Sequence, residues 1–271
     1  MSIIPSFFKN AVVPVGLRQA DSSVRWICTG FFVVRQINES EGTPFLISNR
    51  HVLEGHSQIT ISMKEQGTNA LRLADIDLVE TGKPKYVLHH NPQIDIAILP
   101  LDGDFITNNN LEFPYFNIDV HAMTSSELRS HGVDDGSLVH MLGFPLGLVN
   151  DHSMLPICRL GCIARISEDQ IKESNNILVD IQNFPGNSGS PVILRPEIAA
   201  IEGTGTLTEC VLIGIIHSYI PYKDVLLSNQ TQEIVEIRSE NSGIANAHPV
   251  EFIREIIDGI VPPYTPPTSS N

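Results

Sequence analysis

The sequence predicts an all-β protein with one helix near its C-terminal end, and three observations carry this prediction. Short apolar runs rich in Val, Ile and Phe recur along the 271 residues, and each has the length of one strand. Nineteen glycines and eighteen prolines supply the turns that many short strands need. The spacing of the runs favours a barrel or sandwich over alternating β–α units. The clearest runs cover residues 30–34, 44–47, 59–63, 94–101, 138–143, 161–166, 177–181, 191–194 and 211–217.

The predicted helix covers about residues 249–258. Pro249 suits a first helical turn, and apolar residues then recur at helical spacing on one face. Gly259, Pro262 and Pro263 would end the helix. The apolar face consists of Val250, Phe252, Ile253, Ile256 and Ile257.

Three stretches lack the rhythm of strands. Residues 111–135 are the best candidate for a linker between two halves of the chain. Residues 222–241 are polar and acidic, which predicts a surface loop or excursion. Residues 261–271 are rich in Pro, Ser and Thr, which predicts a disordered tail.

Charge and hydropathy narrow the partners and the location. The formal net charge of −14 disfavours nucleic acid and, more weakly, anionic membranes, because an acidic surface repels phosphate groups. No segment approaches the roughly 20 apolar residues that span a bilayer. The first 14 residues lack the basic start of a secretory signal, so we expect a cytoplasmic protein.

The four cysteines predict no metal site. Cys158 and Cys162 form the only close pair, and no second pair of Cys or His completes a zinc pattern. We therefore expect Cys28, Cys158, Cys162 and Cys210 to be free, buried thiols in a reducing compartment.

The segment Pro185-Gly186-Asn187-Ser188-Gly189-Ser190-Pro191 is the most informative part of the chain. Glycines next to a serine, with a proline at either end, suit neither a helix interior nor a strand interior. They suit a tight loop that presents one hydroxyl and several backbone N–H groups to the same point. Nucleophilic acyl transfer needs that arrangement, because an oxygen attacks while N–H donors hold the oxyanion.

Two segments upstream supply a histidine and an aspartate. An apolar run, 45–47, leads into Ser48-Asn49-Arg50-His51, and a second apolar run contains Asp95. A carboxylate in an apolar run is costly to bury unless it is paired. A partnership with a histidine N–H would satisfy Asp95 and fix the tautomer of the imidazole.

These segments resemble the three triad blocks of the chymotrypsin-like serine peptidases, and they occur in that family's order of His, Asp and Ser. The blocks are Ser48-Asn49-Arg50-His51-Val52, Asp95-Ile96-Ala97-Ile98-Leu99 and Gly186-Asn187-Ser188-Gly189-Ser190-Pro191. Further matches are Thr29-Gly30-Phe31-Phe32-Val33, Gly143-Phe144-Pro145-Leu146-Gly147, Gly161-Cys162-Ile163-Ala164 and Gly243-Ile244-Ala245. The resemblance covers roughly residues 23–258. It is closest to the bacterial branch that includes the high-temperature-requirement proteases and the glutamyl endopeptidases.

The resemblance implies two six-stranded antiparallel β-barrels followed by the final helix. The peptidase domain would cover residues 1–260, with an N-terminal barrel at about 1–115 and a C-terminal barrel at about 130–247. In the implied mechanism Ser188 attacks the peptide carbonyl, His51 transfers the proton and Asp95 orients His51. The backbone N–H groups of Gly186 and Ser188 would form the oxyanion hole. No metal or cofactor is implied.

The resemblance also indicates where a substrate side chain would bind. Gln182, His217 and Tyr219 occupy the stretches that line this pocket in the family. Gln182 is neutral, which gives no support for a preference for Lys or Arg. His217 lies near the position of a carboxylate-binding histidine in the glutamyl endopeptidases, and Tyr219 would narrow the pocket. The implied partner is a protein or peptide substrate. A cytoplasmic protease must be kept from cleaving neighbouring proteins, so we also expect its activity to be restrained by narrow specificity, by an activating partner protein, or by both.

Plainer explanations exist for each residue. Ser188 alone would be an ordinary turn serine, His51 a core histidine and Asp95 the cap of a strand, but three blocks in order favour catalysis. We expect His56, His89 and His90 to be surface or loop residues. The alternative function is a latent or inactive protease fold that acts as a binding or scaffold module. A metallohydrolase ranks last, because no ligand spacing supports it.

Overall fold

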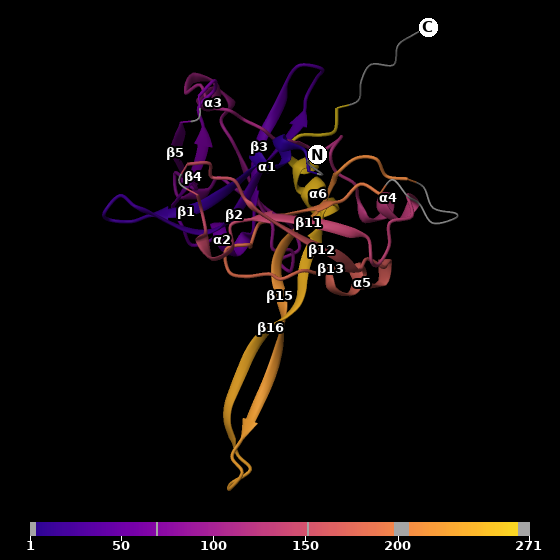
Figure 1. Cartoon of the computed structure of the whole chain (residues 1–271). Helices are drawn as coiled ribbons and strands as arrows, with labels where there is room; N and C mark the ends of the chain where they lie inside the picture. The colour runs from indigo at the N-terminus through magenta and orange to yellow at the C-terminus, as the bar shows by residue number, and fades with distance from the viewer. Residues whose placement is uncertain (1–3, 69, 151, 198–205, 265–271) are drawn as a thin grey trace.

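The computed structural model describes residues 4–68, 70–150, 152–197 and 206–264, and it confirms a protein built mainly of β-strands. Two sheets lie next to each other, one formed by each half of the chain, and the C-terminal helix lies against them (Figure 1). No helix in the described ranges is long and apolar enough to cross a membrane.

The N-terminal half forms an eight-stranded sheet in the order β5-β4-β1-β2-β3-β9-β8, with β10 paired to β2. All pairs are antiparallel except β10 with β2. The strands are β1 (Val12–Arg18), β2 (Val24–Gln36), β3 (Gly42–Ser48), β4 (Gln58–Lys64), β5 (Leu71–Asp77), β8 (Val87–Leu88), β9 (Ala97–Pro100) and β10 (Phe116–Asn117). A separate short hairpin joins β6 (Val79–Glu80) to β7 (Lys83–Pro84).

The C-terminal half forms a closed six-stranded barrel in the order β11-β12-β13-β16-β15-β14. Its inward-facing side chains are almost all aliphatic and fully buried, as in Val139, Val179 and Ile213. The strands are β11 (Leu138–Gly143), β12 (Ile157–Arg165), β13 (Ile177–Asp180), β14 (Pro191–Leu194), β15 (Val211–Leu227) and β16 (Ile234–Pro249).

The N-terminal sheet differs from the second six-stranded barrel that the resemblance implied. Its hydrogen-bonded order begins at β5 and ends at β8, and no pairing between these two edges occurs among the described strands. A hollow lies between Ala74 and Ile76 on one side and Leu101 and Ile106 on the other. All four side chains belong to or pack against the same core cluster. In a closed barrel, backbone hydrogen bonds would join the two edge strands of this sheet. Here apolar side chains lie at the β5 edge in their place.

The predicted helix is present as α6 (Val250–Ile260), and Pro249 is its N-cap residue. Val250, Ile253 and Ile257 are fully buried in a core that also includes Phe31 and Phe45 of the N-terminal sheet and Leu212 and Ile215 of the barrel. The helix therefore packs where the two halves meet. The tail predicted over 261–271 lies outside the described residues from 265 onwards.

Short helices connect the strands, and the sequence did not predict them because they are too short for a helical period. Residues 111–135 contain β10 and α4, whose capping box joins Thr124 and Glu127. The short helices are α1 (Ser6–Asn10), α2 (Arg50–Leu53), α3 (Gly103–Asn108), α4 (Ser125–Ser130), α5 (Glu168–Ser174) and a 3₁₀ turn, η1 (Pro145–Gly147).

Residues 222–241, predicted as a surface loop or excursion, do leave the body of the protein, but as a pair of strands and not as a loop. β15 and β16 continue beyond the barrel and form a long two-stranded arm that projects from the body (Figure 1). The polarity of the stretch suggested a loop, but a strand exposed on both faces is also polar at many positions.

Candidate active site

Ser188 lies in the tight loop between β13 and β14, as its glycines predicted. Gly186 and Gly189 have φ values of 97° and 86°, in the left-handed region that favours glycine. A Cβ on Gly186 would collide with the Phe144 carbonyl oxygen, and a Cβ on Gly189 would collide with that of Thr29. Both positions therefore need glycine for conformation and for space.

The Ser188 loop is held by both halves of the molecule. From β2, the Thr29 N–H donates to the Ser188 carbonyl at 2.9 Å, and Thr29 Oγ1 donates to the Gly186 carbonyl at 2.8 Å. From β15, the Ile216 carbonyl accepts from the Gly189 N–H at 2.9 Å. The Ile216 N–H donates to the Ser190 carbonyl at the same distance. Ser188 is thus fixed at the junction of the two sheets.

The pairing of β3 with β9 brings His51 next to Asp95, as the sequence predicted. His51 follows β3 on α2, and Asp95 precedes β9. His51 Nδ1 lies 2.5 Å from Asp95 Oδ2, and the His51 backbone N–H donates to Asp95 Oδ1 at 2.9 Å. The His51 side chain is 52% exposed and that of Asp95 is 23% exposed, so the imidazole is the more accessible partner.

Two effects oppose each other on the Asp95 carboxyl. Burial alone would raise its pKa, but the hydrogen bonds from the His51 side chain and backbone outweigh burial, so the pKa lies below its usual value. Asp95 is therefore ionised at neutral pH. The Nδ1 atom of a neutral His51 then carries the proton, which leaves Nε2 as the free base.

Two histidines lie next to Asp95, and the sequence analysis did not connect either of them to it. One contacts the Asp95 backbone, and the other stacks on the first. His248 is buried, and its Nε2 accepts from the Asp95 backbone N–H at 2.9 Å. Its Nδ1 donates to the Asn175 carbonyl at 2.8 Å. His217 stacks on His248 with 4.0 Å between ring centroids, and its Nε2 lies 2.7 Å from Asn176 Oδ1.

Both histidines are neutral at physiological pH. Burial and the neighbouring His248 lower the pKa of His217 to about 3, against an opposing effect of Asp95. Burial also lowers the pKa of His248, although its bond to Asn175 and the charge of Asp95 act in the other direction. Neutral rings suit this arrangement, because His248 must keep a lone pair on Nε2 to accept from Asp95.

The three residues predicted to bind a substrate side chain lie in different settings. Gln182 is exposed, and its Nε2 is 3.5 Å from the point that a Cβ on Gly243 would occupy. Tyr219 is 36% exposed on β15 and pairs with Ala245 on β16. The His217 ring contacts His248 and Asn176, beside Asp95. The residues next to Gln182 and His217 are in contact, because the Asn183 side chain donates to the Ser218 carbonyl.

The backbone donors predicted for the oxyanion hole are available. The Pro185 carbonyl accepts from the Leu146 N–H at 2.6 Å, and Leu146 adopts a left-handed φ of 57° in doing so. A trans peptide points its C=O and N–H in opposite directions, so the N–H of Gly186 points away from Leu146. Within the described contacts, the N–H groups of Gly186 and Ser188 donate to no protein acceptor.

The contacts of the described residues include no hydrogen bond between Ser188 Oγ and His51. The structure therefore joins His51 to Asp95 directly and holds Ser188 through its backbone.

One cluster in the described part of the chain has the spacing of a metal site, but its chemistry does not fit. The ligand atoms of His89, His90 and Glu255 lie within 4.8 Å of one another. His89 Nδ1 accepts from the Asn91 N–H at 3.1 Å, so a neutral ring carries its proton on Nε2, which donates to Glu255 at 2.9 Å. A metal would need a lone pair on that same nitrogen.

His89 also corrects a prediction from the sequence. We expected a surface or loop residue, and His89 does lie in the loop after β8, but it is buried: it is 6% exposed and packs on Phe252 of α6, with 5.4 Å between ring centroids. We expected four buried cysteines, and Cys28 and Cys210 are buried, whereas Cys158 is exposed and Cys162 is half-buried.

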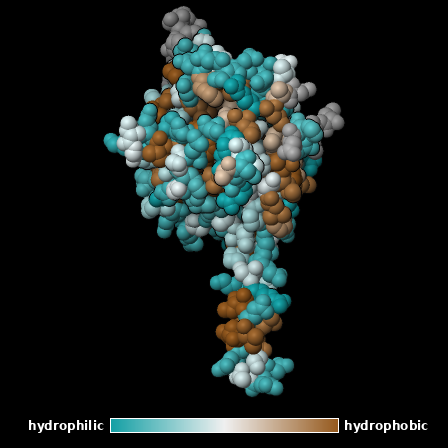
Figure 2. Space-filling view, turned by 90° about the vertical axis from the view of Figure 1, so that its left-hand side faces the viewer, coloured by the Kyte–Doolittle hydropathy of each residue, from teal (hydrophilic) through white to brown (hydrophobic). Residues whose placement is uncertain are grey.

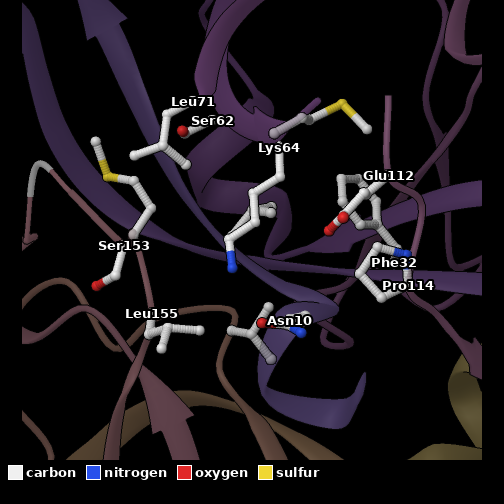
Figure 3. Close-up of a pocket in the computed structure, with 13 residues that line it drawn as sticks. Asn10, Phe32, Ser62, Lys64, Leu71, Glu112, Pro114, Ser153 and Leu155 are labelled. Atoms are coloured by element: carbon white, nitrogen blue, oxygen red, sulfur yellow. The ribbon is translucent and has the colours of Figure 1, made fainter. Parts of the chain in front are cut away.

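A hollow elsewhere on the N-terminal sheet contains none of the predicted site residues (Figure 3). It lies between strands β1, β2, β4 and β5 and residues 153–155. Its polar side chains are Asn10, Ser62, Lys64, Glu112 and Ser153. The residues that line it include neither a histidine nor an aspartate.

The support of Asp95 was the main feature that the sequence analysis missed. His248 immediately precedes Pro249, and Asn175 and Asn176 follow α5 by only one or two residues. No local pattern links these positions to Asp95. The pairing of β13 with β16 brings them together, because Ile177 lies opposite Ala247.

Comparison with known proteins agrees with this fold and geometry. The family model for a trypsin-like peptidase domain matches residues 28–197, which include His51, Asp95 and Ser188. A search of curated proteins gives no match. The family match extends over more than half of the 271 residues, and the chain therefore belongs to the family of trypsin-like peptidase domains.

Proposed function

We propose that the protein is a serine endopeptidase that uses Ser188, His51 and Asp95 as its catalytic triad. The observation that carries the proposal is the double contact of Asp95 with the side chain and backbone of His51. This contact orients an exposed imidazole and leaves its Nε2 as a base. The left-handed glycines of the Ser188 loop add support, because they present a serine and free N–H donors together.

The proposed reaction proceeds in two stages. His51 Nε2 takes the proton of Ser188 Oγ as that oxygen attacks the peptide carbonyl, and the N–H groups of Gly186 and Ser188 bind the oxyanion. His51 then gives its proton to the leaving amine, and an acyl-enzyme remains. Water attacks the ester in the same way, with His51 again as base. The reaction needs no metal or cofactor.

For the substrate we propose a protein or peptide without a basic residue before the scissile bond. Gln182 is exposed, its Nε2 lies 3.5 Å from the point that a Cβ on Gly243 would occupy, and it carries no charge to attract Lys or Arg. Tyr219 would narrow the pocket from the edge of β15. A role of His217 in specificity has less support, because its ring is engaged by His248 and Asn176.

A second candidate is a latent protease fold that binds a partner. It is favoured by one observation, namely that the described contacts join Ser188 Oγ to no residue of the triad. In this case an activating partner would complete the site, and the purified protein alone would be unreactive.

Labelling with a fluorophosphonate probe tests the proposal, with the wild type and Ser188→Ala side by side. Labelling of the wild type alone is expected, because only an activated serine attacks the probe. Absence of labelling in both proteins, with both folded by circular dichroism, would contradict the endopeptidase and favour the latent form. Equal labelling of both would exclude Ser188 as the nucleophile.

A casein digest then separates an unrestrained enzyme from a restrained one. We expect slow or no digestion of unfolded casein by the purified protein, since its specificity or a partner limits it. Rapid digestion without any activator would contradict this restraint while leaving the triad proposal intact.

A further inference from the structure

The arm formed by the outer parts of β15 and β16 exposes large apolar side chains far from the body. β14 pairs with β15 only as far as Ile215, and β13 pairs with β16 only from Ile244 onwards, so beyond these points the two strands pair only with each other. Figure 2 shows brown side chains gathered on the arm above its polar tip. The exposed apolar residues of the outer arm are Tyr222, Val225, Leu226, Leu227, Ile234, Val235 and Ile237.

The strand register sorts most of these residues onto one face. Val225 lies opposite Ile237, and Leu227 lies opposite Ile234. Val225 and Leu227 are alternate residues of β15 and share a face, and each shares that face with the residue opposite it. A register shift between Leu226 and Leu227 offsets the odd separation of Ile234 and Ile237 on β16. These four side chains form one apolar face, which we call the arm face. They are 45%, 57%, 52% and 60% exposed, respectively.

The opposite side of the arm is charged. Asp224 lies opposite Arg238, and Leu226 lies opposite Glu236. Arg238 and Glu236 also form an ion pair of 3.1 Å on the same strand. The arm therefore has the pattern of a sheet with one buried and one solvated face, although nothing in the described chain covers the arm face.

An exposed apolar face of this kind is expected to pack against another protein surface. An isolated two-stranded hairpin is at best marginally stable in water, and exposed apolar faces mark interaction sites. The base of the arm is well tied to the body: the Asn183 side chain donates to the Ser218 carbonyl at 3.0 Å, and the Asn241 side chain donates to the Asn183 carbonyl. The outer half, by contrast, has only its own pairing to hold it.

We propose that a second copy of this chain covers the arm face, with the two arms packed face to face and antiparallel about a two-fold axis. A two-fold contact requires a surface that complements itself, and an uncharged face of four aliphatic side chains does so. Lys223 lies on the body side of the arm face and Glu233 lies in the turn at its tip. Antiparallel packing brings Lys223 of each copy to the end that carries Glu233 of the other.

The overall charge also favours this arrangement over contact between the bodies. Each chain has a net charge of −14, so two bodies repel at short range. The arm extends for about six residues from Tyr222 to Leu227, which at ~3.3 Å per residue is roughly 20 Å. Antiparallel arms would hold the bodies at opposite ends, separated by more than the Debye length of about 8 Å. The repulsion between them would then be largely screened.

Sedimentation velocity of the full chain over about 1–200 µM tests the proposal, since a small interface predicts affinity in this range. We expect a reversible monomer–dimer equilibrium. Ile237→Lys should weaken the dimer at least about tenfold, because it places a charge in the arm face. The matched control Leu226→Lys changes charge equally on the opposite face, next to Glu236, and should leave the equilibrium unchanged.

A charge reversal tests the direction of the two arms. Lys223→Glu and Glu233→Lys should each weaken the dimer about two- to fivefold, and the double variant should regain the wild-type equilibrium. Circular dichroism controls for folding in all five variants.

Three outcomes would overturn the proposal. A protein that stays monomeric throughout the concentration series does not pair with a second copy. This conclusion would hold even if the arm face bound some other protein and Ile237→Lys abolished that binding. A dimer that Ile237→Lys leaves intact must use another surface. Equal weakening by Leu226→Lys would show that the arm face is not the contact. None of these outcomes depends on peptidase activity.

Discussion

The two ends of the hairpin β15–β16 have the same pairing and opposite surroundings. At the barrel end, Ile215 and Ile216 are fully buried between β14, the core and the Ser188 loop. At the arm end, Ile234 and Ile237 are more than half exposed, and only the opposite strand contacts them. The comparison teaches that strand pairing alone stabilises little here. The elements that pack around a pair of strands decide whether its side chains become part of the core, part of the candidate site or part of the exposed surface.

Loss of a barrel-end side chain should give the largest effect. Ile215→Ala removes a fully buried side chain from the core shared by both halves, and a cost of about 3–4 kcal/mol in the free energy of unfolding is expected. Urea denaturation measures it. A cost below about 1 kcal/mol would mean that the barrel end is as loosely packed as the arm.

Acid should weaken the barrel end specifically. The pKa of His217 is about 3 in the folded protein and near 6.5 when unfolded, so the unfolded chain binds the extra proton between these values. The contribution of His217 to the free energy of unfolding is therefore greatest above about pH 6.5. It falls by roughly 2 kcal/mol as the pH drops to about 4.5. Denaturation of wild type and His217→Asn at both pH values checks this. An identical pH dependence in the variant would assign the loss to other groups.

Removing the support of Asp95 should slow the reaction of Ser188. His248→Leu leaves the Asp95 N–H without an acceptor, and about a tenfold lower rate of fluorophosphonate labelling is expected. His248→Gln keeps an acceptor and should recover part of the rate. If both variants labelled at the same rate, the ring of His248 would matter for packing only. This test presupposes labelling of the wild type.

The arm end should respond least. Ile237→Ala in the dilute monomer is expected to change the free energy of unfolding by less than about 0.5 kcal/mol, because the side chain is already 57% exposed. It is the matched counterpart of Ile215→Ala on the same strand pair. A cost of about 2 kcal/mol would show that the arm is covered even in the monomer.

Much of this molecule could be predicted from its sequence, for a physical reason. The strands of the body alternate or cluster apolar residues, and α6 has a clear helical period, so local pattern and fold agree there. The Ser188 loop was predictable because Gly186 and Gly189 are required locally by backbone shape. Its resemblance to known blocks then linked it to His51 and Asp95.

Features that depend on distant pairing could not be predicted. The contact of His248 with Asp95 exists only because β13 pairs with β16, and nothing near either residue signals it. The open edges of the N-terminal sheet depend on which side chains fill the gap between β5 and α3. The arm was missed for a different reason. Charged residues such as Asp224 and Arg238 make its strands polar enough to be read as a loop.

The bonds of Thr29 to the Ser188 loop have a consequence for how the site is assembled. Ser188, the proposed nucleophile, belongs to the C-terminal half, yet Thr29 of the N-terminal half donates to its carbonyl, and that same half supplies His51 and Asp95. Neither half contains a complete site. The proposed reaction is therefore a property of the docked pair, so separately produced halves should be inert and should regain reactivity only on reassociation.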